Sequence, residues 1–94
     1  RQRQMCIRDS SDLVPALEIM IATPAVRALI RKGETHQLYS VIQTSRQVGM
    51  QTMNQCLRDM VASRLITRET ALANSLNPEE LQQLLFAGHE DRHL

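Results

Sequence analysis

The chain has few aromatic residues. Tryptophan is absent, and Tyr39 and Phe86 are the only aromatic side chains among the 94 residues. Because 43% of the residues are nevertheless hydrophobic, five methionines among them, a folded core must be built from aliphatic side chains and methionine. A chain of this length forms at most one small domain.

Other scarcities exclude several classes of protein. The formal net charge is only +1, so nothing calls for binding to nucleic acid. No apolar run approaches the roughly 20 residues of a membrane-spanning helix, and we expect no direct insertion into a membrane. The two cysteines, Cys6 and Cys56, are too few for a disulfide framework and are typical of a reducing cytoplasm.

The motifs of phosphate chemistry are missing from these residues. There is no G-x-x-x-x-G-K loop followed by serine or threonine, no other glycine-rich loop and no acidic cluster that would hold magnesium. We therefore expect no catalytic residue, no cofactor-binding residue and no metal ligand in this stretch, which should catalyse nothing by itself.

One motif near the end needs a separate judgement. The residues HEDRH (89–93) fit H-E-x-x-H, in which two histidines hold zinc and the glutamate acts as general base. A zinc protease needs this motif inside a rigid helix, with a third ligand further along. Here the motif follows Gly88, which predicts a helix end, and only Leu94 comes after it. We interpret residues 88–94 as a flexible, solvated tail and not as a protease site.

The first ten residues, RQRQMCIRDS, show no hydrophobic period. They resemble a translated sequencing adaptor: the transposon end AGATGTGTATAAGAGACAG, taken from its ATG, encodes Met-Cys-Ile-Arg-Asp. The alternative is a natural basic tail. We expect residues 1–10 to be a non-native tail and exclude them from the fold. Their three arginines and one aspartate contribute +2, so the remainder carries +1 minus +2, or −1.

An apolar run, DLVPALEIMIA, occupies residues 12–22. Its β-branched residues and short length predict a strand buried on both faces, although a helix starting at Pro15 is an alternative. A single strand cannot pair its own amides and carbonyls. We expect residues 11–22 to be the last strand of a sheet whose other strands precede this chain.

Two helices are predicted after the strand. Thr23 and Pro24 have the types expected of an N-cap and a first helical residue, and Gly33 marks the end of this helix. The second begins near Thr35 and ends before Gly49. Its apolar face is Leu38, Val41 and Ile42.

Three more helices are predicted beyond Gly49. Thr52 and Gln55 have the spacing of a capping box, Thr67 can cap a short fourth helix, and Asn77 with Pro78 opens a fifth. The apolar positions of the three helices are Met53, Cys56, Leu57 and Met60, then Ala71 and Leu72, then Leu81, Leu84 and Leu85. The predicted fold is mainly α, with a helical domain over residues 23–87.

Two side-chain groups could carry chemistry, but a structural role is favoured for each. Cys56 shares an apolar face with Met53 and Met60, which favours core packing over a nucleophile. Arg27 and Arg31 lie one helical turn apart and could bind a carboxylate or phosphate, although an exposed basic face is the simpler interpretation.

Several blocks together resemble one family. They are VPALEIMIATPAVRALIRKG (14–33), THQLYSVIQT (35–44), GMQTMNQCL (49–57), LITRE (65–69) and PEEL (78–81). In this order and spacing they resemble the C-terminal part of the PilT-type retraction ATPases, the twitching-motility motors of type IV pili within the secretion-ATPase superfamily. Two positions depart from the family pattern: Ala28 stands where asparagine is common, and Arg64 where glycine is frequent. If position 64 is left-handed, a residue with a side chain costs about 1 kcal/mol there.

The resemblance implies a hexameric motor that uses ATP and magnesium to withdraw pilin subunits, working at the cytoplasmic face of the inner membrane with the pilus platform as partner. It implies that this chain supplies the last strand of a RecA-like core and a helical C-terminal cap, with the nucleotide-binding motifs further upstream. It also implies a retraction element that binds a partner, which corresponds here to Ala25, Val26, Arg27, Leu29, Ile30 and Arg31. We expect Val26, Leu29 and Ile30 to pack and the two arginines to point away.

Two alternatives remain open. The sister assembly and type II secretion ATPases share the general layout but usually carry a tetracysteine zinc loop and lack the Q-L-Y-S-x-I-Q-T block. A standalone helical interaction module is the other alternative, and an unpaired strand buried on both faces would argue against it.

Overall fold

The computed structural model describes residues 1–9 and 12–92, the last five of them as helix backbone only. Its strands are β1 (Gln2–Asp9) and β2 (Asp12–Ile19), and its α-helices are α1 (Pro24–Arg31), α2 (Leu38–Thr44), α3 (Met53–Ala62), α4 (Arg68–Asn74) and α5 (Pro78–Arg92). Two short 3-10 turns, η1 (Thr35–Gln37) and η2 (Arg46–Val48), flank α2. The fold is mainly α, as the sequence predicts.

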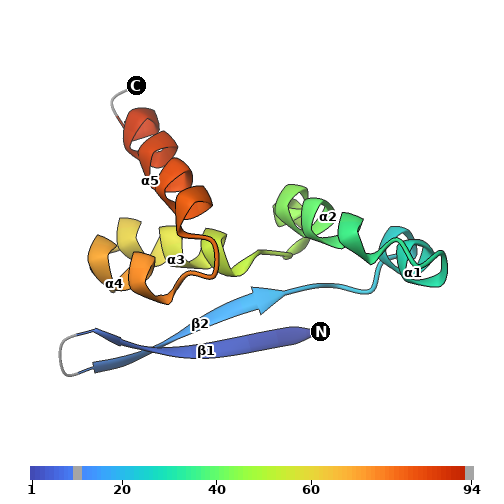
Figure 1. The fold of residues 1–94 in the computed structure, drawn as a ribbon, viewed down its shortest axis with the longest axis horizontal. Coiled ribbons are helices and arrows are strands. Elements are labelled where there is room, and N and C mark those ends of the chain that lie inside the picture. Colours follow the sequence, from blue (N-terminus) through green and yellow to red (C-terminus); the bar gives the residue numbers. More distant parts are fainter. Residues whose placement is uncertain (10–11, 93–94) are drawn as a thin grey trace.

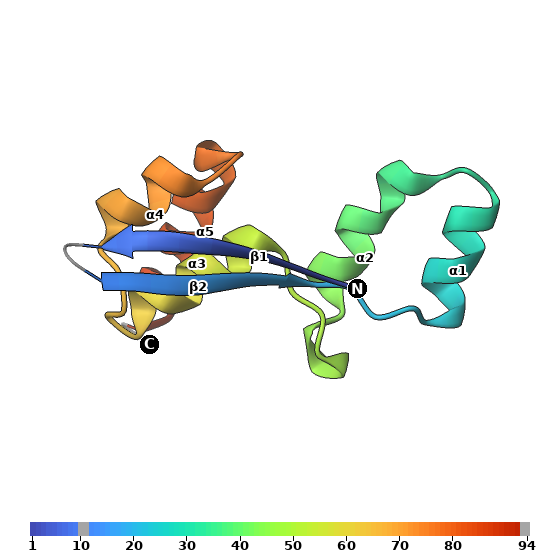
Figure 2. The same ribbon diagram turned by 90° about the horizontal axis from the view of Figure 1, so that it is seen from below.

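The helices form two groups along a β-hairpin. Figure 1 shows α3, α4 and α5 over one face of the hairpin near its turn, with α1 and α2 beyond its other end. The view in Figure 2 shows the opposite face of the hairpin without a covering helix. Within the described residues no helix is long and apolar enough to cross a membrane.

The hairpin corrects two predictions. Residues 1–10 were excluded from the fold, but residues 2–9 form β1, which pairs antiparallel with β2. The buried positions alternate along it, because successive side chains of a strand point to opposite faces. Ile7 is fully buried against the helices.

The expectation that β2 is buried on both faces is also wrong. Ala16 is fully buried under the helices, whereas Leu13 is 61% exposed on the other face. The helices cover only one side of a two-stranded sheet, so on the other side Leu13 and Pro15 are exposed, while Leu17 and Ile19 are half-buried. A strand forms here as predicted, but β2 ends at Ile19 and not at residue 22; the break before α1 is as predicted.

The helix starts predicted at Thr23, Thr52 and Thr67 are confirmed by their caps, whereas the start predicted near Thr35 is a 3-10 turn without a side-chain cap, and α2 begins only at Leu38. Thr23 Oγ1 accepts from Val26 N at 3.3 Å at the start of α1, and Thr67 Oγ1 accepts from Thr70 N at 3.1 Å at the start of α4. At α3 both bonds of the capping box form: Thr52 Oγ1 accepts from Gln55 N at 3.1 Å, and Gln55 Oε1 accepts from Thr52 N at 3.0 Å. Each bond satisfies an amide that the first turn would leave unpaired.

The helix ends follow the sequence less closely. Gly33 and Gly49 adopt left-handed φ angles of 73° and 95°, as chain-reversing glycines do. Arg64 also has a positive φ, of 65°, so the condition stated for a strained residue at this position is met. In contrast, α5 does not end before Gly88 but continues to Arg92. An internal glycine costs about 1 kcal/mol relative to alanine, which α5 accommodates.

Two separate apolar clusters hold the helices. The larger lies between the hairpin and α3–α5 and consists of Ile7, Ala16, Met53, Leu57, Met60, Ile66, Ala71, Leu81 and Leu85. The smaller joins α1 to α2 and the segment before α3, and consists of Val26, Ile42 and Met50. We call the helices α3, α4 and α5 the α3–α5 unit and the helices α1 and α2 the α1–α2 unit.

Candidate functional site

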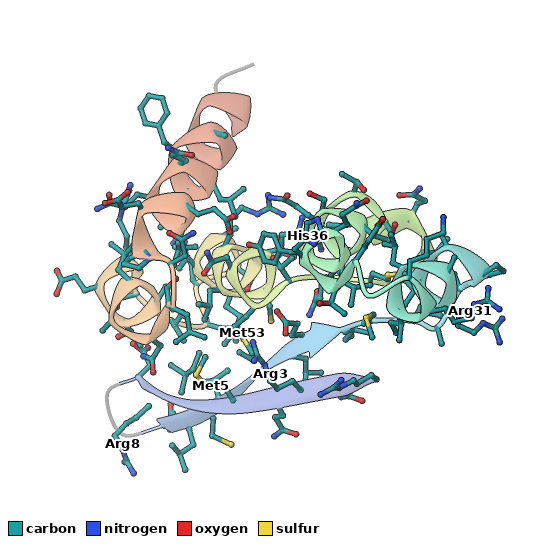
Figure 3. All side chains as sticks on the ribbon, turned by 45° about the vertical axis from the view of Figure 1, so that its right-hand side comes forward. Arg3, Met5, Arg8, Arg31, His36 and Met53 are labelled. Carbon is teal, nitrogen blue, oxygen red and sulfur yellow. The ribbon has the colours of Figure 1, made fainter. Side chains whose placement is uncertain are left out.

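The predicted partner-binding element is α1, whose N-terminal turn is fixed by the Thr23 cap and by Pro24 at the first helical position. Val26 is fully buried and anchors the helix in the smaller cluster. Arg27 and Arg31 are exposed, and neither forms an ion pair with any described residue. Figure 3 shows Arg31 at the far end of the molecule, directed away from the hairpin.

Ile30 corrects the predicted packing face. It was expected to be buried with Val26 and Leu29, but its side chain is 49% exposed, while Leu29 is half-buried. An eight-residue helix that rests on one neighbour buries a narrow stripe, and Ile30 lies at the edge of that stripe. The exposed surface of α1 therefore combines two guanidinium groups with an aliphatic side chain.

This combination determines what α1 can bind. Guanidinium groups one turn apart can each donate several hydrogen bonds to carboxylates, and an adjacent aliphatic side chain adds apolar contact area. Lys32 follows directly and is also exposed. Such a surface can contact carboxylate or phosphate groups together with apolar atoms.

A second group of polar side chains lies where the two units meet. Tyr39 of α2 donates a hydrogen bond from its hydroxyl to Glu80 Oε1 of α5. Asn54 of α3 donates to the same oxygen at 2.8 Å. The pKa of Tyr39 is raised to about 12, first by the partial burial of the phenol and then by Glu80, because ionising the phenol would break its hydrogen bond and place two negative charges together. Sequence reasoning missed this group, since nothing in the spacing of three polar residues on three helices predicts their contact.

A cavity of about 610 Å³ opens beside these residues, within the described part of the chain. Its lining is Arg3, Gln4, Met5, Glu18, Tyr39, Met53, Asn54, Leu76 and Asn77. Figure 3 shows Met5 and Met53 on the facing sides of the hairpin and α3. Because three of the nine lining residues belong to the adaptor-like segment, we assign no ligand to it.

The remaining candidates have structural positions. Cys56 packs against the larger cluster, as predicted, and its Sγ accepts from Leu17 N at 3.4 Å. His36 is exposed on η1. The side chains of the H-E-x-x-H motif lie outside the described residues. In the described part of the chain, no three His, Cys, Asp or Glu side chains come close enough together to hold a metal ion.

Comparison with known proteins decides the family. The type IV pilus retractation ATPase PilT of Pseudomonas aeruginosa is 52% identical over 66 residues, which are 70% of this chain and 19% of PilT. A twitching motility protein of Neisseria gonorrhoeae is 41% identical over 80 residues, 85% of this chain and 21% of that protein. The chain belongs to the PilT-type pilus ATPases.

The match extends to a second member from the same bacterium. The type IV pilus ATPase PilU of P. aeruginosa is 36% identical over 74 residues, 79% of this chain and 19% of PilU. No model of a known protein family matches the chain. The chain spans about a fifth of the length of these PilT-type relatives.

Proposed function

We propose that the chain is the C-terminal portion of a hexameric type IV pilus retraction ATPase, which couples ATP hydrolysis to pilus disassembly and twitching motility. The observation that carries this proposal is the 52% identity to PilT over 66 residues. The name of the Neisseria relative, a twitching motility protein, supports the same assignment.

Within that motor, we assign β2 to the edge of the ATPase core and residues 23–87 to the helical C-terminal domain. ATP and magnesium would be bound by other parts of the full-length protein, and the residues described here take no chemical step. The motor would work in the cytoplasm, at the inner membrane, on the platform of the pilus machinery.

We further propose that the exposed side of α1 contacts that partner. Val26 fixes the helix to the protein, whereas Arg27, Ile30 and Arg31 remain accessible.

The experiment is a chimera. In a P. aeruginosa strain that lacks PilT, the corresponding segment of PilT is replaced by residues 12–87 of this chain, and the twitching zone and ATPase rate are measured. We expect twitching to be restored. A chimera that forms hexamers and hydrolyses ATP but does not support twitching would contradict the proposal.

Charge reversal then tests α1. We expect Arg27→Glu with Arg31→Glu to reduce twitching strongly while the ATPase rate stays within about twofold, because surface changes rarely disturb a fold. Arg68→Glu on α4, which is equally exposed, is the matched control and should leave twitching intact. Equal losses in both variants would count against a role for α1.

A standalone helical interaction module is the second candidate. The observation in its favour is that β2 is paired with β1 and buried on one face only. Complementation by the chimera separates the two candidates, since an unrelated module would not replace a motor segment.

A further inference from the structure

The two units are joined by polar contacts. Among the described residues, no side chain belongs to both apolar clusters. Besides the chain connections and the backbone bridge between Ile19 and Gln51, the position of α2 on the α3–α5 unit depends on side-chain hydrogen bonds and an ion pair, whose energies depend on direction and distance far more than apolar contact does.

Three side-chain contacts link α2 or its flanking turn to the other unit. Gln55 Nε2 donates to Gln43 O at 2.9 Å near the C-terminal end of α2. The Arg46–Asp59 ion pair at 2.7 Å lies just beyond that end, but its side chains are 39% and 45% exposed, so solvent screens it. The third contact is made at the opposite end of α2 by Tyr39, whose hydroxyl bonds to Glu80 and also interacts with Thr52. Tyr39 is itself 41% exposed, but its acceptor is held by a buried side chain.

Glu80, which accepts the hydrogen bond from Tyr39, is held in place by residues other than Tyr39. Asn54 is buried, 6% exposed, and donates to Glu80 Oε1 at 2.8 Å and to Asn77 O at 3.1 Å. Ser75 Oγ in turn donates to Asn54 Oδ1 at 2.6 Å. A carboxylate fixed in this way presents an oriented, charged acceptor, which makes a stronger hydrogen bond than a neutral one.

We propose that the Tyr39–Glu80 hydrogen bond, supported by Asn54, is the contact that fixes the orientation of the α1–α2 unit on the α3–α5 unit. If α2 were held only near Gln43, it could rotate about that contact. The hydrogen bond from Tyr39 holds α2 at a second position, and its acceptor Glu80 lies 41 residues further along the sequence. Because α1 packs on α2 through the smaller cluster, the same bond fixes the direction of α1.

Hydrogen exchange of the 94-residue chain tests this inference. We expect Tyr39→Phe to speed exchange of the α1 and α2 amides about three- to tenfold, the range of one net hydrogen bond, and to leave the α3 and α5 amides unchanged. Thr44→Val is the matched control, because it also removes one hydroxyl from α2, but one that bonds only to Ser40 O and Val41 O within the helix. Equal exchange in the two variants would overturn the inference.

A second measurement does not depend on that substitution. Tyr39 is the only tyrosine and tryptophan is absent, so the ultraviolet absorption of tyrosinate reports this residue alone. We expect Glu80→Gln to lower the pKa of Tyr39 below its value in the parent chain, since it removes the charge that faces the phenol. An unchanged tyrosine titration in a folded Glu80→Gln variant would show that the contact does not form.

Discussion

At the scale of single residues, two side chains of the same type can differ greatly in burial, which the sequence alone does not show. Leu57 is fully buried in the larger cluster, whereas Leu65, eight positions later, is 55% exposed. We expect Leu57→Ala to lower the free energy of unfolding by about 2–5 kcal/mol, because it leaves a cavity that the surrounding helices fill only partly. Urea unfolding measures the difference.

Leu65→Ala is the matched control for that substitution. It removes the same atoms from a mostly solvated position, so we expect a change within about 0.5 kcal/mol. Equal losses at both positions would contradict the assigned core.

Tyr39 predicts a pH dependence. Its pKa is raised to about 12 from the ordinary value of 10.0, so the folded chain favours the neutral phenol. The stability it contributes is fully present below the unfolded pKa of about 10 and is lost as the pH rises toward the folded value. We expect the free energy of unfolding to fall more steeply above pH 10 in the parent chain than in Tyr39→Phe, as measured by urea unfolding across this range. Parallel curves would contradict the raised pKa.

At the scale of elements, helix starts could be predicted and contacts between helices could not. Thr23, Thr52 and Thr67 cap their helices as predicted because an N-cap needs only a short-range hydrogen bond, which spacing reveals. The Tyr39–Glu80–Asn54 group brings together three helices, so local sequence holds no signal for it. The end of α5 was misjudged for a related reason: a glycine permits a helix to end but does not require it.

The capping box of α3 can be tested directly. Thr52 is 1% exposed, and its hydroxyl accepts from Gln55 N. We expect Thr52→Ala to cost about 1 kcal/mol, or somewhat more since the position is buried. Thermal unfolding measures the loss. Thr44→Ala, which changes an exposed threonine inside α2, should cost clearly less, and a reversed order would contradict the assigned cap.

A substitution at Arg64 should stabilise the chain instead of destabilising it. Its φ of 65° is unfavourable for a residue with a side chain. We expect Arg64→Gly to raise the free energy of unfolding by about 0.5–1 kcal/mol, since glycine adopts this conformation freely. Arg68→Gly, in the first turn of α4, should not stabilise the chain. A loss of stability in Arg64→Gly would show that the arginine side chain contributes more than the backbone strain costs.

At the scale of the whole molecule, the mainly helical architecture and the position of the strand were predictable from periodicity, but the hairpin was not. Residues 2–9 have a composition that hides their alternation, because only Met5 and Ile7 of the inward positions are apolar. The one-sided burial of β2 follows from that pairing, so it could not be inferred from β2 alone.

The packing of the hairpin against the helices predicts how substitutions in β1 change the stability of the chain. Ile7 is fully buried in the larger cluster, whereas its neighbour Cys6 is exposed. We expect Ile7→Ala to lower the free energy of unfolding by about 2–4 kcal/mol and Cys6→Ala to change it little. If both substitutions were neutral in urea unfolding, residues 2–9 would not belong to the folded core.

The attachment of α1 has a mechanical consequence. Of the eight residues of this helix, all of which the structure describes, Val26 alone is buried. A force applied by a partner to Arg27 or Arg31 therefore acts at a short distance from Val26, the one buried contact, and exerts a torque on the helix. We therefore expect a pull on these arginines to tilt α1 relative to α2 before it separates the two helices.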